Sequence, residues 1–259
     1  MASSTAFPKA SNPCSASKSM SDDKTAGLRR RFYTGVSIKV EEGGYAVLLD
    51  GRAFKTPGRT TLLATTEPLA EAIAAEWEAQ GEKINPHSMP LTQIACTVTD
   101  HIVTGRADIE EQLARFAEAD LLCYRAENPK DLAERQQQMW QPVLDWMASH
   151  HAIHLSVTTA VIAEPQSEQA LAKVCAVIAD FDAHELAALS VLTQAMGSLS
   201  LGLAVMHGYL DWESAAKAAQ LDETFQSELW GMDREAELRL KALRDEMESA
   251  SRYLSLHRS

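Results

Sequence analysis

Cysteine is scarce in this sequence. Only four occur among 259 residues, and they are far apart, with no CxxC pair: Cys14, Cys96, Cys123 and Cys175. Small secreted proteins that depend on disulfides carry many closely spaced cysteines, whereas a chain of this length can form a sizeable hydrophobic core. The spacing therefore argues against a disulfide framework and predicts a reducing compartment.

Positive charge is also in short supply. The chain has 24 basic and 36 acidic side chains, for a net charge of −12. Residues 1–31 carry six basic and two acidic groups, so the remaining 228 residues carry 18 against 34, a net charge of −16. Proteins that bind nucleic acids or anionic membranes present a basic surface to them. We therefore expect neither nucleic acid nor an anionic membrane surface to be the main partner.

The first 28 residues show neither of the common targeting patterns. They have no apolar run long enough for a secretory signal, and their only charged residues are three lysines and two aspartates. Mitochondrial presequences are rich in arginine and poor in acidic residues. We expect residues 1–29 to form a disordered leader.

One stretch is long enough to span a bilayer. Residues 186–206 carry no charge, and about 20 apolar residues suffice to cross a membrane. Serine, threonine and glutamine side chains interrupt the stretch, however, and no aromatic belt marks its ends. It predicts a buried central helix in a soluble protein, without stable membrane insertion.

The motifs of several large enzyme classes are missing. The sequence contains no GxxxxGK[ST], no GxGxxG, no HExxH and no GxSxG, so the common phosphate cradles and two hydrolase signatures are absent. Asp182 and Glu185 could form an acid–base pair, but a helix N-cap accounts for both residues more simply. By composition and spacing alone, the residues therefore indicate no active site.

Three histidines provide the sharpest alternative. His150 and His154 lie four residues apart with His151 between them, and two histidines at this spacing on a helix can share a metal ion. No acidic residue or cysteine lies beside them, and histidines near the end of a helix also complement its dipole. A small metal-dependent hydrolase that uses this cluster is therefore the alternative hypothesis.

Strand patterns come first in the chain and helix patterns follow. Residues 32–65 alternate in polarity, and the Asp50-Gly51 pair predicts a type I′ hairpin. Thr66 is expected to cap a helix that runs to Gly81. Further helices are expected before residue 150, followed by a late strand at 153–159.

From residue 167 onward every pattern is helical. It includes an apolar helix at 185–206 and a long amphipathic helix at 222–254. This order predicts an α+β fold, with a disordered leader at 1–29, an N-terminal α+β lobe at 30–160 and an all-helical C-terminal lobe at 161–259.

The start of the last predicted helix mixes acidic and aromatic residues. Phe225 and Leu229 share one face, whereas Glu228 and Trp230 fall elsewhere around the helix. Gly231 inside a helix would cost about 1 kcal/mol relative to alanine, which suggests a close approach or a partner. The residues alone favour a core tryptophan and a solvated acidic face over a binding surface.

The chain resembles the assembly chaperones that handle the alpha subunit of the F-type ATP synthase catalytic head. The resemblance begins at Arg31 and continues almost to the C-terminus. The matching segments, in the order of the family, are Arg31-Phe32-Tyr33, Leu49-Asp50-Gly51-Arg52, Lys55-Thr56-Pro57, Leu69-Ala70, Ala75-Glu76-Trp77, Gln80, Met89-Pro90-Leu91-Thr92, Asp120-Leu121-Leu122-Cys123-Tyr124-Arg125, Gln138 with Trp140, Pro142 and Trp146, and Asp222-Glu223 with Gln226, Glu228, Trp230-Gly231, Asp233 and Glu235-Ala236.

The resemblance implies a non-enzymatic chaperone without cofactor or metal. Its partner is expected to be the free alpha subunit, whose beta-facing surface it covers until the catalytic head assembles. An unpaired subunit exposes an apolar interface that is prone to aggregation. The positions carried over as partner-binding candidates are Trp77, Glu223, Glu228, Trp230, Asp233 and Glu235. Trp77 fits a core residue equally well, because it ends the apolar stripe formed with Leu69 and Ile73.

The resemblance also bears on the compartment. Mitochondrial members of the family carry a presequence, and the leader of this chain lacks that pattern. The bacterial cytoplasm is therefore expected, in preference to the mitochondrial matrix.

Overall fold

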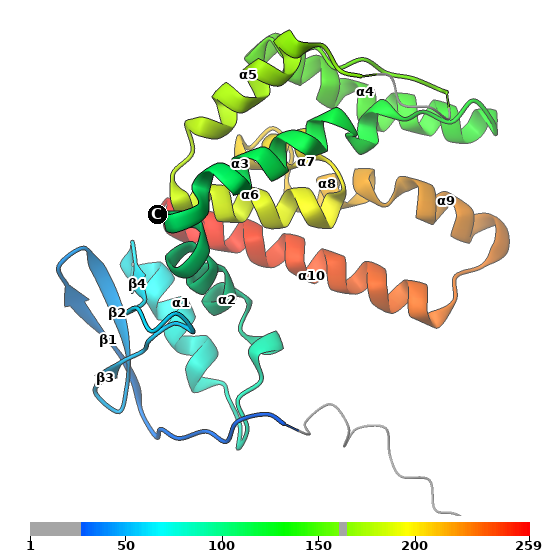
Figure 1. Cartoon of the computed structure of the whole chain (residues 1–259). Coiled ribbons are helices and arrows are strands. Elements are labelled where there is room, and N and C mark those ends of the chain that lie inside the picture. The colour runs from blue at the N-terminus through cyan, green and yellow to red at the C-terminus, as the bar shows by residue number, and fades with distance from the viewer. Residues whose placement is uncertain (1–26, 161–164) are drawn as a thin grey trace, which may run out of the picture.

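The computed structural model describes residues 27–160 and 165–259. The predicted leader at 1–29 therefore lies outside the described residues, apart from its last three positions. The N-terminal lobe holds a small antiparallel sheet with a helix packed against it (Figure 1). Its elements are β1 (Val36–Glu41), β2 (Gly44–Leu49), β3 (Arg52–Ala53), β4 (Leu63–Ala64) and α1 (Glu67–Glu78).

The predicted hairpin at Asp50-Gly51 is confirmed. β2 pairs with β3 across these two residues, and both have positive φ angles, 49° for Asp50 and 76° for Gly51, as a type I′ turn requires. The Asp50 carboxylate accepts hydrogen bonds from the backbone N–H groups of Gly35 at 2.8 Å and Thr34 at 3.0 Å. These donors lower the pKa of the carboxyl group and fix the segment that leads into β1.

The remaining helices and strands of the described chain are all helices, joined by irregular segments, so the α+β class is confirmed. They follow in the order η2 (Pro86–Ser88), α2 (Pro90–Thr97), the π-helix η3 (Val98–Ile102), α3 (Val103–Glu118), η4 (Leu121–Cys123), α4 (Lys130–His151), α5 (Glu168–Ala179), α6 (Ala183–Met196), α7 (Leu199–Met206), α8 (Trp212–Ala219), α9 (Leu221–Trp230) and α10 (Arg234–His257). The predicted caps are present: Thr66 accepts a hydrogen bond from the N–H of Leu69, and Asp182 and Glu185 form a capping box.

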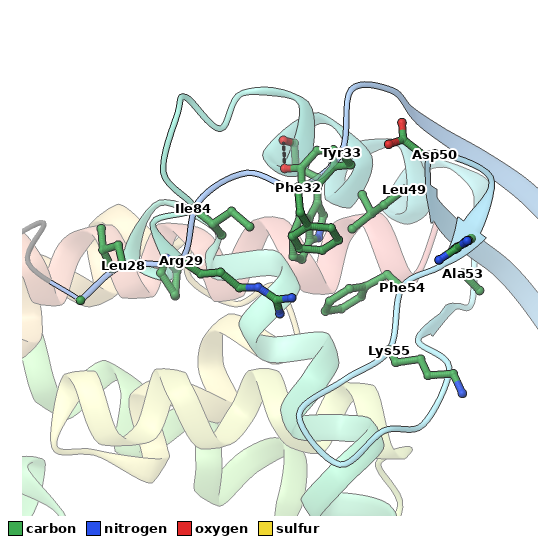
Figure 2. A pocket seen from close by; sticks show the side chains of 14 residues that line it. Leu28, Arg29, Phe32, Tyr33, Leu49, Asp50, Ala53, Phe54, Lys55 and Ile84 are labelled. Carbon is green, nitrogen blue, oxygen red and sulfur yellow. Dashed lines mark hydrogen bonds between the residues drawn. The ribbon is translucent and has the colours of Figure 1, made fainter.

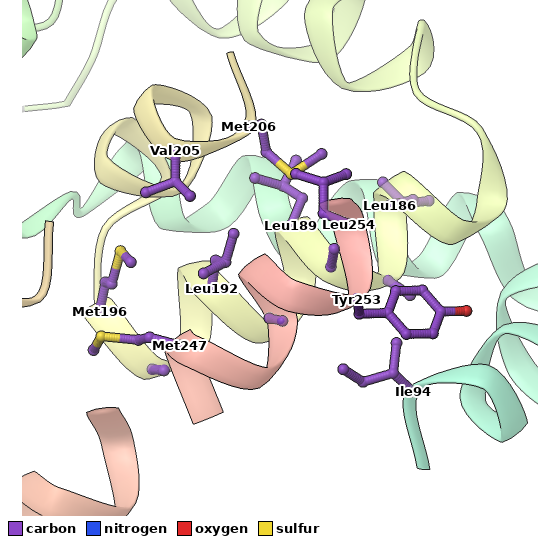
Figure 3. Packing of buried hydrophobic residues seen from close by; sticks show 14 of the residues in the cluster. Ile94, Leu186, Leu189, Leu192, Met196, Val205, Met206, Met247, Tyr253 and Leu254 are labelled. Carbon is purple, nitrogen blue, oxygen red and sulfur yellow. The ribbon is translucent and has the colours of Figure 1, made fainter. Parts of the chain in front are cut away.

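The core is centred on α6, α7 and α10 (Figure 3). All eight residues of α7 are buried, which explains why this stretch is apolar on every side. Gly202 lets the two helices approach, because a Cβ there would lie 2.8 Å from Thr193 Oγ1 on α6. Within the described residues, no helix is long and apolar enough to cross a membrane.

The prediction of one helix at 185–206 was wrong. α6 ends at Gly197, whose φ of 64° is left-handed, and the Ser198 side chain caps α7 by accepting from the N–H of Leu201. Asp120, which is fully buried, holds this break by accepting hydrogen bonds from Ser198 Oγ at 2.7 Å and Ser200 N at 2.9 Å. Burial raises the pKa of the Asp120 carboxyl group, and its hydrogen-bond donors oppose that rise.

The prediction of one helix at 222–254 was also wrong. Gly231 has a φ of 81° and ends α9, and the Asp233 side chain accepts from the N–H of Ala236 to begin α10. The segment therefore forms two helices joined by a sharp turn.

The predicted late strand at 153–159 does not form. Within the described residues of this segment there is only an isolated bridge, between Tyr124 and Thr158. Of the alternating apolar residues, Ile153 is fully buried where the chain leaves α4 through Ala152, a left-handed residue with a φ of 53°, whereas Val157 is 42% exposed.

Helices from before and after residue 160 pack together. α3 contacts α5 and α6, and α4 contacts α7 and α9. In Figure 1, α3 and α4 lie with the C-terminal helices, whereas α1 lies against the sheet and α2 lies between α1 and α10. The proposed lobe boundary at 160/161 remains a prediction.

Candidate functional site

Large apolar side chains are exposed at the turn between α9 and α10. The exposed fractions are 56% for Leu229, 78% for Trp230, 46% for Met232 and 58% for Leu238. We call residues 228–238 the α9–α10 tip. Figure 1 places it at the far end of the helical lobe from the sheet. Trp230 is therefore not the core tryptophan that the residues alone favoured.

Acidic side chains neighbour these apolar groups in the sequence, with Arg234 as the one basic residue of the tip. Glu228 precedes Trp230 and pairs with Arg135 Nη1 on α4 at 2.8 Å. Asp233 uses one carboxylate oxygen to cap α10, with 2.8 Å to the Ala236 N. Glu235 is exposed in the first turn of α10. The tip thus combines apolar anchors with a negative rim, the composition expected of a protein-binding surface.

The base of α9 is fixed while its end projects. Phe225 is buried, and the Arg135 guanidinium lies 5.2 Å from the centre of its ring. Gln136 Nε2 donates to Asp222 Oδ1 at 2.8 Å, which ties the first turn of α9 to α4. A rigid base holds the exposed side chains in a defined position and lowers the entropy that a partner must remove on binding.

Glu223 lies apart from the tip. It lines a pocket of about 390 Å³ between the start of α9 and α10, together with Gln220 and Leu243. Gln220 is buried and organises the pocket, because Arg244 Nε donates to its Oε1 at 2.6 Å. Four of the six predicted partner-binding residues, Glu228, Trp230, Asp233 and Glu235, therefore lie on the tip, and Glu223 lies nearer the base of α9.

Trp77 lies in the other lobe. It ends the buried face of α1 and is 5% exposed. Its ring packs against Phe54, with 4.6 Å between ring centroids, and against Tyr33 at 5.7 Å. Tyr33 Oη donates to the Trp77 carbonyl at 2.7 Å. The structure does not bring Trp77 together with the other five candidates.

The histidine cluster does not form a metal centre. Within the described ranges, no group of three or more His, Cys, Asp or Glu side chains is placed to hold a metal ion. His150 and His151 instead end α4 and pack on Trp146, whose ring centroid lies 5.6 and 5.1 Å from theirs. His154 is exposed, beyond the buried Ile153. The hydrolase alternative therefore has no support.

Met232 and Leu238 are site residues that the sequence did not single out. The interpretation as one long helix hid them, because it placed Gly231 inside a helix. The available signal was Gly231 followed by Asp233, a helix breaker and a capping residue close together.

The comparisons with known proteins agree with one another. The model of the family described as "ATP12 chaperone protein" matches residues 30–148. Among curated proteins, "Protein atp12, mitochondrial" of Schizosaccharomyces pombe is 26% identical over 214 residues, covering 78% of this chain and 74% of its own length.

Two solved structures extend the match over most of the chain. The crystal structure of Atp12 from Paracoccus denitrificans has 40% identity and a TM-score of 0.83, and the match covers 88% of this chain and 98% of that one. A crystal structure of a protein from Agrobacterium tumefaciens has 36% identity and a TM-score of 0.84, with 88% and 86% covered. The chain therefore belongs to the ATP12 chaperone family, the ATP synthase assembly chaperones that its sequence resembles.

Proposed function

We propose that this protein binds the free alpha subunit of the F-type ATP synthase, shields its beta-facing surface from aggregation, and releases it as the catalytic head assembles. The observation that carries the proposal is the α9–α10 tip, where Trp230 is 78% exposed within a cluster of apolar side chains. Glu228, Asp233 and Glu235 lie in the same segment, next to these side chains in the sequence.

The tip has the features that transient binding requires. A few large apolar side chains, tryptophan above all, carry most of the binding energy of protein interfaces. A charged rim speeds association and opposes binding to the wrong surface. Binding of this kind involves no chemical step, so we propose that the protein is not an enzyme and needs no cofactor or metal.

Binding to purified alpha subunit tests the proposal directly. Trp230→Ala is expected to weaken binding by about 2 kcal/mol, a factor of roughly 30, because it removes the largest exposed anchor. Glu228→Lys is expected to weaken binding as well, because it reverses one charge of the rim. Titration calorimetry with isolated alpha subunit measures both effects. The same titration with assembled catalytic heads should show no binding.

Matched substitutions elsewhere separate binding from general surface effects. Val103→Ala removes another apolar side chain that is 67% exposed, and Glu71→Lys reverses an exposed charge on α1. Both should bind alpha like the wild type. Full-strength binding by folded Trp230→Ala and Glu228→Lys variants would refute the site, and failure of the wild type to bind alpha would refute the function.

We further propose a bacterial cytoplasmic location. The support is the higher identity to the Paracoccus and Agrobacterium proteins, 40% and 36%, than to the mitochondrial protein of S. pombe, 26%. Fractionation of the native host tests it: the protein should remain in the cytoplasmic fraction, and recovery from another compartment would contradict the proposal.

A further inference from the structure

A second surface feature lies in the N-terminal lobe, remote from the α9–α10 tip. It is a pocket of about 770 Å³ between the segment that precedes β1 and the β2–β3 hairpin. Its walls include Phe32, Leu49, Phe54 and Ile84. Figure 2 shows Arg29 and Phe54 reaching into the same space from opposite sides, with Phe32 between them. A pocket of this volume can hold a large apolar side chain and part of the peptide that carries it.

An aromatic side chain in the wall of this pocket is largely exposed to solvent. Phe32 is 55% exposed, although its neighbour Tyr33 is buried and hydrogen-bonded to the Trp77 carbonyl. The Phe32 ring contacts Tyr33 edge-on, with 5.4 Å between ring centroids. An exposed aromatic ring against a buried aromatic cluster is a common arrangement at protein-binding sites.

The pocket is basic in a strongly acidic protein. Arg29, Arg52 and Lys55 line it, and Asp50 is the one acidic side chain among its described lining residues. Asp50 is already occupied, because Gly35 and Thr34 donate hydrogen bonds to it. Arg52 and Lys55 form no ion pair within the described part of the chain. The local net charge of +2 therefore contrasts with −12 for the whole chain.

Arg29 links the aromatic and the basic lining residues of the pocket. Its guanidinium lies 4.6 Å from the centre of the Phe32 ring, so the aromatic wall holds a cation at the opening. An arginine in this position can still pair with a carboxylate, since its N–H donors lie in the plane of the guanidinium.

We propose that this pocket docks an acidic peptide segment of a partner protein. One large apolar side chain of the segment enters between Phe32 and Phe54, and its carboxylates pair with Arg29, Arg52 and Lys55. Charge complementarity identifies this occupant. Residues 1–26 of the chain itself carry three lysines and two aspartates, so they lack the net negative charge that would pair with the basic side chains of the pocket. The inference does not depend on the identity of the client at the α9–α10 tip.

A fluorescent peptide of glutamates around one central phenylalanine is the probe. Fluorescence anisotropy with the full chain should show saturable binding that weakens as salt is added. Arg52→Glu with Lys55→Glu should weaken binding by about tenfold or more, and Phe32→Ser should weaken it severalfold. All three side chains are exposed, so these variants should fold, and circular dichroism checks that they do.

Matched controls separate binding in the pocket from a general effect of charge. Lys39→Glu with Lys130→Glu makes the same total charge change at exposed positions outside the pocket, and this variant should bind the probe within about twofold of the wild type. A peptide with lysines in place of the glutamates, or alanine in place of the phenylalanine, should bind at least about tenfold more weakly. Equal losses in the two double variants, or equal binding of the lysine peptide, would overturn the proposal.

A photo-crosslinker identifies the occupant. Phe32→p-benzoylphenylalanine in the full chain, irradiated with the glutamate probe present, should form a crosslink to the probe. A crosslink to residues 1–26 or to a second copy of the chain, undiminished by excess probe, would overturn the proposal by showing that the chain itself fills the pocket.

Discussion

His151 and His207 lie in contact within an aromatic cluster beside α4. Their ring centroids are 4.7 Å apart, and each also packs on Trp146, at 5.1 and 5.9 Å. Tyr209 covers the other part of the cluster, stacked on Trp146 at 5.0 Å. His151 Nε2 is buried and has no hydrogen-bond partner in the described structure. The cluster therefore favours neutral imidazoles.

These contacts make the stability of the protein depend on pH. Burial is the main cause that lowers the pKa of both histidines. The charge of His150 lowers the pKa of His151 further, and the charges of His151 and Arg258 lower that of His207. In the unfolded chain a histidine takes up its proton near pH 6.5. Between that value and the lower folded-state pKa, the unfolded chain holds more protons. The free energy of unfolding should therefore fall as the pH drops through about 6.5 toward the folded-state pKa values.

Urea denaturation at a series of pH values measures this dependence. His151→Leu replaces the imidazole with an apolar side chain that cannot take up a proton. The unfolding free energy of this variant should therefore depend less steeply on pH than that of the wild type. His87→Leu, on the exposed η2 turn, should keep the wild-type slope. A slope for His151→Leu equal to that of the wild type would show that the cluster does not control the dependence.

At the scale of elements, the α9–α10 turn gives Asp233 two separable roles. Its side chain caps α10 by accepting a hydrogen bond from the Ala236 N, and its second oxygen adds charge to the rim of the proposed binding surface. Serine also caps helices but carries no charge, whereas alanine does neither. The pair Asp233→Ser and Asp233→Ala therefore distinguishes folding from binding.

Asp233→Ala should lower the free energy of unfolding by about 1 kcal/mol, and Asp233→Ser by much less. Both should weaken alpha binding if the charge contributes to recognition. Thermal or urea unfolding gives the first comparison and calorimetry the second. If Asp233→Ser binds alpha like the wild type, Asp233 acts only as a helix cap and leaves the set of partner-binding residues.

Local chemistry explains which elements could be predicted. The Asp50-Gly51 turn and the Thr66 and Asp182 caps depend on contacts within a few residues, so the sequence indicated them correctly. The breaks at Gly197 and Gly231 were missed because hydrophobic periodicity continues across them. Only the backbone shows that these two glycines take positive φ angles, a conformation that the sequence permits without requiring.

The surfaces were harder to predict than the elements. The sequence made both Trp230 and Trp77 binding candidates and left a core role open for Trp77, and the structure has Trp230 78% exposed and Trp77 5% exposed. That difference depends on tertiary packing, because Trp77 is covered by Tyr33 and Phe54 from distant parts of the chain. The basic pocket was missed for the same reason, since Arg29, Phe32 and Phe54 meet only when the segment before β1 packs beside the hairpin.

At the scale of the whole molecule, the last turn of α10 joins the start of α1 to the central helices. Thr65 Oγ1 and His257 Nδ1 form a hydrogen bond of 2.7 Å, and Thr66 Oγ1 donates to the Leu256 carbonyl at 2.6 Å. On the other side, Arg258 pairs with Glu185 on α6 at 2.6 Å. The same short segment therefore binds both the start of α1 and the central helices.

Removing residues 255–259 should uncouple the sheet and α1 from the central helices. These residues supply the bonds to Thr65, Thr66 and Glu185, whereas Leu254 and the buried part of α10 remain in the core. In the full chain, hydrogen exchange in β2 and α1 should report nearly the same opening free energy as in α6 and α7. In the shortened chain, β2 and α1 should open at lower free energy while α6 and α7 stay protected. An equal loss of protection in both regions would instead mean that the last turn stabilises the molecule as one cooperative unit.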